Sequence, residues 1–248
     1  MPKRSKPPSR EQADFRNAQV YHAQLLTEIL SLFSIYCGMC GEHGREVEPA
    51  LARAIFFTLF GCIEASSRVL ATSLLLADIF PRKKGSRTAL ALSLSEAETL
   101  FLRQETAEIS RTNWTVCNRT KFVALEDALV GYPAIYARVF RQKVSISKSC
   151  REWQDFMKLK RLRDIGAHGN TNELRSAPDS MHVSYADLKR LIECRRWYCS
   201  QLVGLPWIAN VEAREEIRFI DLLLEAGFSD KCRKIREKRY TQQHAAPL

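Results

Sequence analysis

The chain has 248 residues, of which 46% are hydrophobic and 27% charged, a composition typical of a soluble globular protein with one large domain or one domain and an appendage. Its formal net charge of +10 favours a polyanionic partner, nucleic acid more than an anionic membrane surface. No apolar segment follows the basic, proline-rich residues 1–10, so we expect no signal peptide, a cytoplasmic protein and eight reduced cysteines.

The first half of the chain is predicted to be helical. Residues 1–10 have the composition of a disordered basic tail, and apolar residues recur at helical spacing over 11–37. Pro49 suits the first turn of a second helix over 48–79, which is apolar on most of its sides. Charged residues, among them Arg53, Glu64 and Arg68, interrupt its apolar run, which therefore indicates a buried core helix and not a membrane span.

The second half continues this pattern. A helix begins at Ser95, with weak helical spacing as far as Trp114. Further helices are expected over 121–142 with a break at 131–133, over 150–167 with Ser149 as its cap, from Ser184 to 203, over 210–226 and over 229–241. No strand pair is predicted. The sequence therefore predicts an all-α fold, an up-and-down bundle with additional helices.

Glu64 and Arg68 lie four residues apart, on one face of the most apolar predicted helix. Unpaired charges inside a core helix are costly, so this face either meets a cleft or is neutralised by partners. An arginine from another helix, such as Arg163, is one possible partner. A buried structural salt bridge and a functional pair both remain open.

Arg163 and His168 stand at the end of the helix predicted over 150–167 and just beyond it. Five residues place them about 140° apart on an ideal helix, but the length of arginine and a loose turn at Gly166 allow both tips to meet in one groove. Asp164 lies four residues before His168, on its face, where it can orient the imidazole. The negative end of the helix macrodipole favours the protonated imidazole. The alternative is a plain cationic helix cap.

Together the two segments resemble the HEPN superfamily, the higher eukaryote and prokaryote nucleotide-binding helical domain. Its members combine Glu-x3-Lys/Arg on an apolar helix with a later Arg-polar-x(3–5)-His, here Glu64-Ala-Ser-Ser-Arg68 and Arg163-Asp164-Ile-Gly-Ala-His168. Glu152-Trp153, followed by Leu159 and Leu162, adds to the likeness. The resemblance covers residues 11–203, with 81–148 as an insertion and 204–248 as a C-terminal helical extension.

The resemblance implies a metal-independent RNA endonuclease that uses the ribose 2′-hydroxyl as nucleophile and leaves 2′,3′-cyclic phosphate ends, a toxin or host-defence effector. It implies no metal, no other cofactor and no membrane, a homodimer, and an antitoxin or effector-complex protein as a partner. The catalytic residues would be Arg163, His168, Asp164 and Glu64. The RNA-binding residues would be Arg68, Lys158, Lys160, Arg161 and Asn170.

Two features depart from the family pattern. The chain is longer than a minimal HEPN bundle, with the surplus in 81–148 and after 204. Most members also carry asparagine where this chain has Asp164, which adds a negative charge beside a phosphate site unless it orients His168 or pairs with Arg163. This favours a second hypothesis, a non-catalytic HEPN-like module that binds RNA or a nucleotide. A third is a helical adaptor for protein partners. The family branch that is modified on a tyrosine two residues after the histidine has Asn170 here, so that modification is not expected.

Two further patterns allow alternatives. Cys37-x2-Cys40-x2-His43 offers three zinc ligands, but with no second paired motif a tight turn with free thiols is the preferred interpretation. The C-terminal run KCRKIREKRY surrounds its predicted helix with positive charge. It suits RNA binding, although a solvated helix surface is the preferred interpretation.

Overall fold

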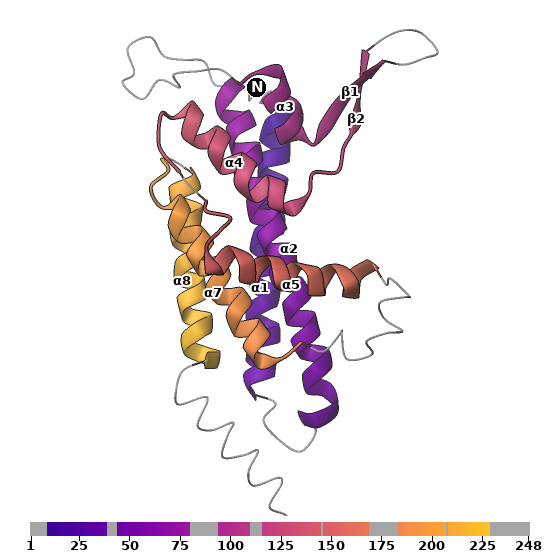
Figure 1. The fold of residues 1–248 in the computed structure, drawn as a ribbon, viewed down its shortest axis with the longest axis vertical. Helices are drawn as coiled ribbons and strands as arrows, with labels where there is room; N and C mark the ends of the chain where they lie inside the picture. Colours follow the sequence, from indigo (N-terminus) through magenta and orange to yellow (C-terminus); the bar gives the residue numbers. More distant parts are fainter. Residues whose placement is uncertain are drawn as a thin grey trace, which may run out of the picture. The chain divides into compact units, whose positions relative to one another are not determined.

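The computed structural model describes residues 9–38, 44–79, 94–109, 116–144, 146–168, 183–206 and 208–228. Along the chain the elements are α1 (Arg10–Gly38), α2 (Gly44–Ile79), α3 (Glu96–Arg103), β1 (Glu105–Ile109), β2 (Val116–Thr120), α4 (Leu125–Val139), α5 (Arg151–His168), α7 (Tyr185–Leu202) and α8 (Ile208–Phe228) (Figure 1). The predicted all-α fold is confirmed. The C-terminal helix expected over 229–241 lies outside the described residues.

The chain divides into two compact units. The first, termed unit 1, draws on Met1–Ala23, Glu64–Ile146 and Gln201–Glu212. The second, unit 2, draws on Gln24–Ile63, Ser147–Ser200 and Ala213–Leu248. The boundaries between them fall inside α1, α2, α7 and α8, and α5 belongs wholly to unit 2.

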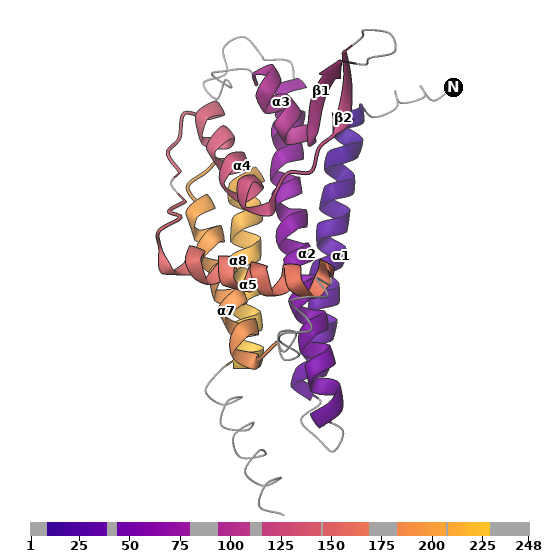
Figure 2. The same cartoon turned by 45° about the vertical axis from the view of Figure 1, so that its right-hand side comes forward.

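Unit 2 has an aromatic and aliphatic core. In both views α5 crosses the adjoining part of α2 instead of running along it (Figures 1 and 2). Where they cross, the Phe60 ring of α2 lies 5.6 Å from that of Phe156 on α5. Helices α7 and α8 run antiparallel. Arg196 pairs with Asp221, and the hydroxyl of Tyr185, near the start of α7, donates to the carbonyl of Gly227, near the end of α8. The core also includes Ile29, Phe33, Ile55, Phe56, Leu188, Leu191 and Leu223.

Unit 1 is organised around α3 and α4. α3 starts at Ser95, as the sequence predicted, and the structure shows that Ser95 and Glu98 form a capping box there. The Arg138 guanidinium of α4 then holds the Glu98 carboxylate through two hydrogen bonds of 2.7 and 2.5 Å. Gln104, at φ 56°, ends α3 in the left-handed conformation and turns the chain into β1.

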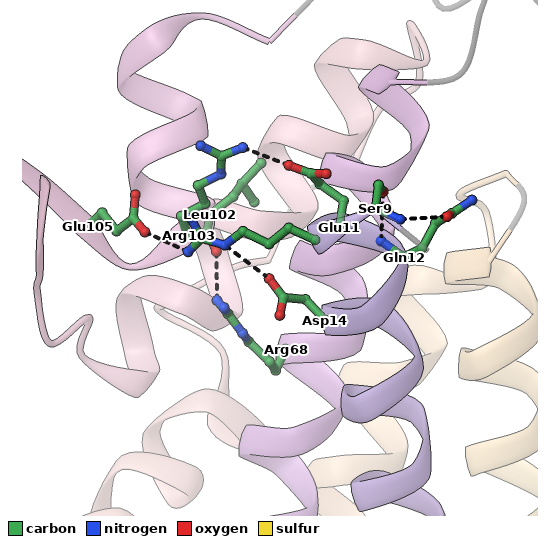
Figure 3. A network of polar contacts seen from close by, with 9 residues as sticks. Ser9, Glu11, Gln12, Asp14, Arg68, Leu102, Arg103 and Glu105 are labelled. Carbon is green, nitrogen blue, oxygen red and sulfur yellow. Dashed lines mark hydrogen bonds and ion pairs between the residues drawn. The ribbon is translucent and has the colours of Figure 1, made fainter. Parts of the chain in front are cut away.

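The start of α1 is fixed by polar contacts within unit 1 (Figure 3). Ser9 and Gln12 form a capping box, with the Gln12 amide donating to the Ser9 hydroxyl and the Ser9 amide to the Gln12 side chain. Arg10 pairs with Glu105 at 2.9 Å, and Arg103 pairs with Glu11 at 2.9 Å. The predicted disordered tail is therefore wrong at residues 9 and 10, and residues 1–8 lie outside the described part.

Three further predictions need correction. The helical spacing expected beyond Ser95 ends at Arg103, and residues 105–109 pair antiparallel with 116–120 as a hairpin. The break expected at 131–133 does not occur, because α4 continues through Pro133, which is buried. Cys150, and not Ser149, caps α5: its sulfur accepts a hydrogen bond from the Trp153 amide at 3.4 Å.

The long helix α2 is apolar enough to raise the question of a membrane. By length and composition alone, Pro49–Ala77 qualifies as a membrane span, one such helix in the described part of the chain. Within the protein, 61% of its most apolar window is buried. Burial of this kind matches the core helix that the sequence predicted.

Gly227 tests the packing of α1 against α8 in unit 2. A Cβ atom at this position would lie 2.2 Å from Cε1 of Phe33, whose ring is buried. We therefore expect Gly227→Ala to lower the free energy of unfolding by about 1–3 kcal/mol, measured by urea denaturation. Gly204→Ala is the control, because a Cβ there meets no atom within 4 Å. Equal effects of the two substitutions would contradict this packing.

Glu98 gives unit 1 a pH-dependent contribution to stability. Burial acts to raise the pKa of Glu98, but hydrogen bonds from Ser95 and Arg138 outweigh it, so the pKa lies below 4.5. The stabilisation is therefore complete above about pH 4.5 and is lost as the pH falls through the lowered folded-state value. We expect Glu98→Gln to cost about 1 kcal/mol at pH 7 and less at pH 3, by urea unfolding. The control, the exposed Glu96→Gln, should show little change at either pH.

Candidate nucleic-acid interface

Helix α5 separates an apolar face from a basic one. Trp153, Phe156 and Leu159 are buried at helical spacing and attach the helix to the core of unit 2. The opposite stripe is exposed, with successive spacings of three, four and three residues, and consists of Arg151, Gln154, Lys158 and Arg161. This set, termed the basic stripe, includes two of the predicted RNA-binding residues.

Asp155 lies beside the basic stripe and offsets part of its charge. Its carboxylate is mostly buried and lies 3.6 Å from the Arg151 guanidinium and 3.4 Å from the Lys158 ammonium. Both cations are themselves exposed, so each ion pair is worth little in water. The cations therefore remain accessible to an anionic polymer.

Arg163 lies against the core rather than in open solvent. Its guanidinium stands over the Phe60 ring, 5.4 Å from the ring centre. The same ring packs on Phe156, so the cation rests on an aromatic platform built from α2 and α5. The sequence predicted that α2 is a core helix but not that Phe60 is the platform for Arg163, because periodicity carries no information on which distant side chain a residue contacts.

Asp164 bridges two cations. Its Oδ1 lies 3.1 Å from Nη1 of Arg163, and its Oδ2 accepts a hydrogen bond of 2.7 Å from Nζ of Lys160. All three side chains are partly buried. The structure thus brings together three of the predicted site residues, termed the Lys160–Arg163–Asp164 cluster.

For His168, the second residue of the predicted catalytic pair, the structure describes the backbone only. His168 is the last residue of α5, five residues or about 1.4 turns after Arg163. Its side chain and the whole of Asn170 lie outside the described residues. Convergence of the imidazole with the guanidinium therefore stays a prediction.

Glu64 and Arg68 belong to the part of α2 in unit 1. Glu64 is exposed, and its backbone carbonyl accepts a hydrogen bond of 2.8 Å from Ser67. Arg68 donates from Nη1 to the Leu102 carbonyl at 2.7 Å, at the end of α3 (Figure 3). This contact ties α2 to α3, a structural role that the Glu-x3-Arg pattern did not predict.

The predicted turn contains Cys37, Cys40 and His43. The structure describes Cys37, whose thiol is partly buried and forms no disulfide, and the other two residues lie outside its described part. Among the described residues, no three His, Cys, Asp or Glu side chains gather as a metal site.

Sequence analysis missed a buried polar cluster in unit 2. The Arg195 guanidinium of α7 pairs with the Glu216 carboxylate of α8, and both side chains are buried. The Cys199 thiol donates to the same carboxylate at 3.1 Å, and Arg195 stands over the Tyr198 ring at 5.2 Å. The available signal was a charged residue among the apolar, buried positions of an amphipathic helix, in each of α7 and α8.

This cluster favours a structural role for its cysteine. Burial raises the pKa of the Cys199 thiol. The Arg195 charge lowers this pKa and the Glu216 carboxylate raises it, and the resulting pKa lies well above the ordinary value of a thiol. Burial acts to lower the pKa of Arg195, but Cys199 and Glu216 outweigh it and the pKa is raised. The guanidinium is therefore charged and the thiol protonated at neutral pH, which makes Cys199 a weak nucleophile.

The described part of α5 therefore combines an exposed basic stripe with the Lys160–Arg163–Asp164 cluster. Such a surface suits contact with a phosphodiester backbone through charge and paired donors. Comparisons with protein-family models, with curated proteins and with solved structures found no match to this chain.

The buried ion pair gives a stability prediction. Glu216→Gln leaves the Arg195 charge without its carboxylate in a low-dielectric core, so we expect it to lower the free energy of unfolding by about 3–5 kcal/mol. The double variant Arg195→Met, Glu216→Leu should recover most of this loss, because apolar groups replace both charges. Both are measured by urea denaturation.

The matched control is Asp221→Asn, which breaks the exposed pair with Arg196 and should cost under about 1 kcal/mol. A cost for Glu216→Gln no larger than that of Asp221→Asn would show that this pair does not anchor α7 to α8.

Proposed function

We propose that this chain is a metal-independent RNA endonuclease of HEPN type, a toxin or host-defence effector acting as a cytoplasmic homodimer. The single observation that carries this proposal is the placement of Arg163 and His168 in the last turns of one helix, α5, whose exposed stripe is basic. A protein inhibitor or effector complex would restrain its activity.

The proposed chemistry assigns one role to each residue. Neutral His168 takes the proton of a ribose 2′-hydroxyl, whose oxygen attacks the adjacent phosphorus and displaces the 5′-oxygen. A protonated imidazole, from the same chain or its dimer mate, gives a proton to that leaving oxygen. Arg163 donates to the phosphate oxygens as charge accumulates on them, and the products are a 2′,3′-cyclic phosphate and a 5′-hydroxyl.

The requirement for a 2′-hydroxyl selects RNA over DNA. Lys158 and Arg161 on the basic stripe would attract the backbone, and this contribution weakens as salt is added. Glu64 would act by holding an arginine in place.

A second candidate has its own support. Arg163 is mostly buried and already pairs with Asp164, where most family members carry a neutral asparagine. An arginine held in this way suits a non-catalytic module that binds RNA along α5 without cutting it.

The decisive test is cleavage of bulk RNA by purified protein in EDTA, with the fragment ends identified as 2′,3′-cyclic phosphates. Arg163→Ala and His168→Ala should each lower the cleavage rate by about 100-fold or more. Arg196→Ala, which removes an exposed cation from α7 of the same unit, should leave the rate within about twofold. Toxicity on expression should be relieved by His168→Ala.

Each alternative has its own result. Cleavage that persists in both variants would indicate a contaminating nuclease and contradict the proposal. Retention of RNA without cleavage would support the binding module, and neither binding nor cleavage would support a protein adaptor.

A further inference from the structure

The hairpin of β1 and β2 has a defined inner and outer side. Its register pairs residues 105–109 with residues 116–120 without a bulge. Next to the first pair, the Lys121 amide donates to the Gln104 carbonyl at 2.7 Å, which makes these two residues a hydrogen-bonded pair. Bonded and non-bonded pairs alternate along an antiparallel ladder. The peptide groups that point away from β1 are therefore those of residues 116, 118 and 120.

The outer edge of β2 is open to pairing. Within the described residues the sheet has two strands, so no third strand there takes up the outward N–H and C=O groups of β2. The sequence of β2, VCNRT, contains no proline and no lysine, and the strand has no bulge, although these are the features that commonly block an edge. The edge of β1 differs, because its first residue, Glu105, pairs with Arg10 at the start of α1 (Figure 3). The edge of β2 is therefore the more accessible one.

The outward groups of β2 are complementary to those of a second β2. When two copies meet antiparallel with their Asn118 residues face to face, Val116 of each copy faces Thr120 of the other. Each facing pair then exchanges two hydrogen bonds, so every outward group of both strands is satisfied. In the same register Arg119 faces Cys117, so no two like charges lie directly opposite each other. This arrangement has the twofold symmetry that is commonest among homodimers.

An exposed phenylalanine follows the same strand. Phe122 lies two residues beyond the end of β2 and is 87% exposed, the highest value among the exposed large hydrophobic residues of the described chain. The chain is held on both sides of it, because Lys121 bonds to the end of α3 and Leu125 is buried at the start of α4. In the antiparallel pairing, Phe122 lies diagonally across from Val116 of the second copy, within reach of an aromatic ring. A second copy would thus cover an apolar ring that unit 1 leaves in water.

We infer that the outer edge of β2 is a dimerisation surface, where two copies of this chain pair antiparallel about Asn118 and join their hairpins into one sheet. The inference rests on the proposed function in taking a second copy as the partner. It assigns the contact to unit 1, apart from the residues of α5 to which the nuclease chemistry is assigned. A strand pair of this length buries less than the roughly 1,000 Å² of a stable interface, so the dimer is weak, with a Kd of about 10–100 μM.

The test is sedimentation velocity of the full-length chain from about 1 to about 200 μM, which brackets this Kd. Asn118→Pro removes the outward N–H at the twofold axis and leaves the hairpin's own hydrogen bonds in place, because the amide of residue 118 does not bond to β1. It should raise the Kd about 100-fold or more, so that the chain stays monomeric. The matched control, Ala107→Pro, removes an outward N–H from the edge of β1 and should leave the Kd within about twofold.

A second variant serves if the proline disrupts the hairpin. Phe122→Ser should raise the Kd about tenfold, because the diagonal contact is lost twice in a symmetric dimer. Its control is Tyr21→Ser, which removes another exposed aromatic ring of unit 1 and should change the Kd less than about twofold. Circular dichroism and thermal melting establish that each variant is folded. Hydrogen exchange of the amides in 116–120 should slow as the parent chain is concentrated, whereas exchange in 105–109 should not.

The inference is overturned if the parent chain stays monomeric throughout, if Asn118→Pro and Phe122→Ser dimerise like the parent, or if either control weakens the dimer equally. Cleavage of RNA in EDTA by the same proteins is scored separately. Cleavage by a parent chain that is monomeric, or that dimerises through another surface, supports the nuclease and removes the β2 interface. A dimer that Asn118→Pro dissociates, without cleavage by any of the proteins, supports the interface and removes the nuclease proposal.

Discussion

The contact between the Phe60 ring and the Arg163 guanidinium joins the apolar core of unit 2 to its charged surface. Phe60 is buried and packs on Phe156, so the helices that supply these rings fix each other in position. The Arg163 guanidinium lies over the Phe60 ring, so the position of the ring helps to fix the position of the cation. Any function of Arg163 therefore depends on the packing of α2 against α5. A substitution in this core can displace the Arg163 guanidinium even when no charged residue is changed.

Unit 2 balances charge differently inside and outside. In the core, Arg195 meets Glu216 in a pair of one cation and one carboxylate, because an excess charge there is costly. On α5, Lys160 and Arg163 both pair with Asp164. The exposed cations Arg151, Lys158 and Arg161 of the basic stripe lie where a polyanion can approach them, in keeping with the overall charge of +10.

Most helices could be predicted because their apolar periodicity is local and strong. The starts at Ser95 and Ser184 followed from capping chemistry, and the structure shows both. The hairpin was missed because its first strand, ETAEI, contains residues that disfavour strands and is stabilised by pairing with VCNRT further along the chain. Pro133 was misjudged because tertiary packing offsets the hydrogen bond that proline removes from a helix.

For the candidate site, the sequence predicted which residues of α5 carry charge, and the structure added which of them meet. Asp164 was considered as a partner of either His168 or Arg163, and the ion pair with Arg163 is present. The second partner, Lys160, and the ring beneath Arg163 were not foreseen. Contacts between helices are set by how the chain packs, which periodicity within one helix does not encode.

Neither unit is a continuous stretch of sequence, and this has a consequence for how the protein is made. Unit 1 takes its last segment from Gln201–Glu212, and unit 2 requires α8 residues that follow. A nascent chain therefore cannot complete unit 1 until Glu212 has been synthesised, and cannot complete the core of unit 2 until most of α8 has been synthesised. Until then α2, the most apolar helix, lacks part of its cover, which makes this period of synthesis the one in which the chain is most exposed to aggregation or capture by chaperones.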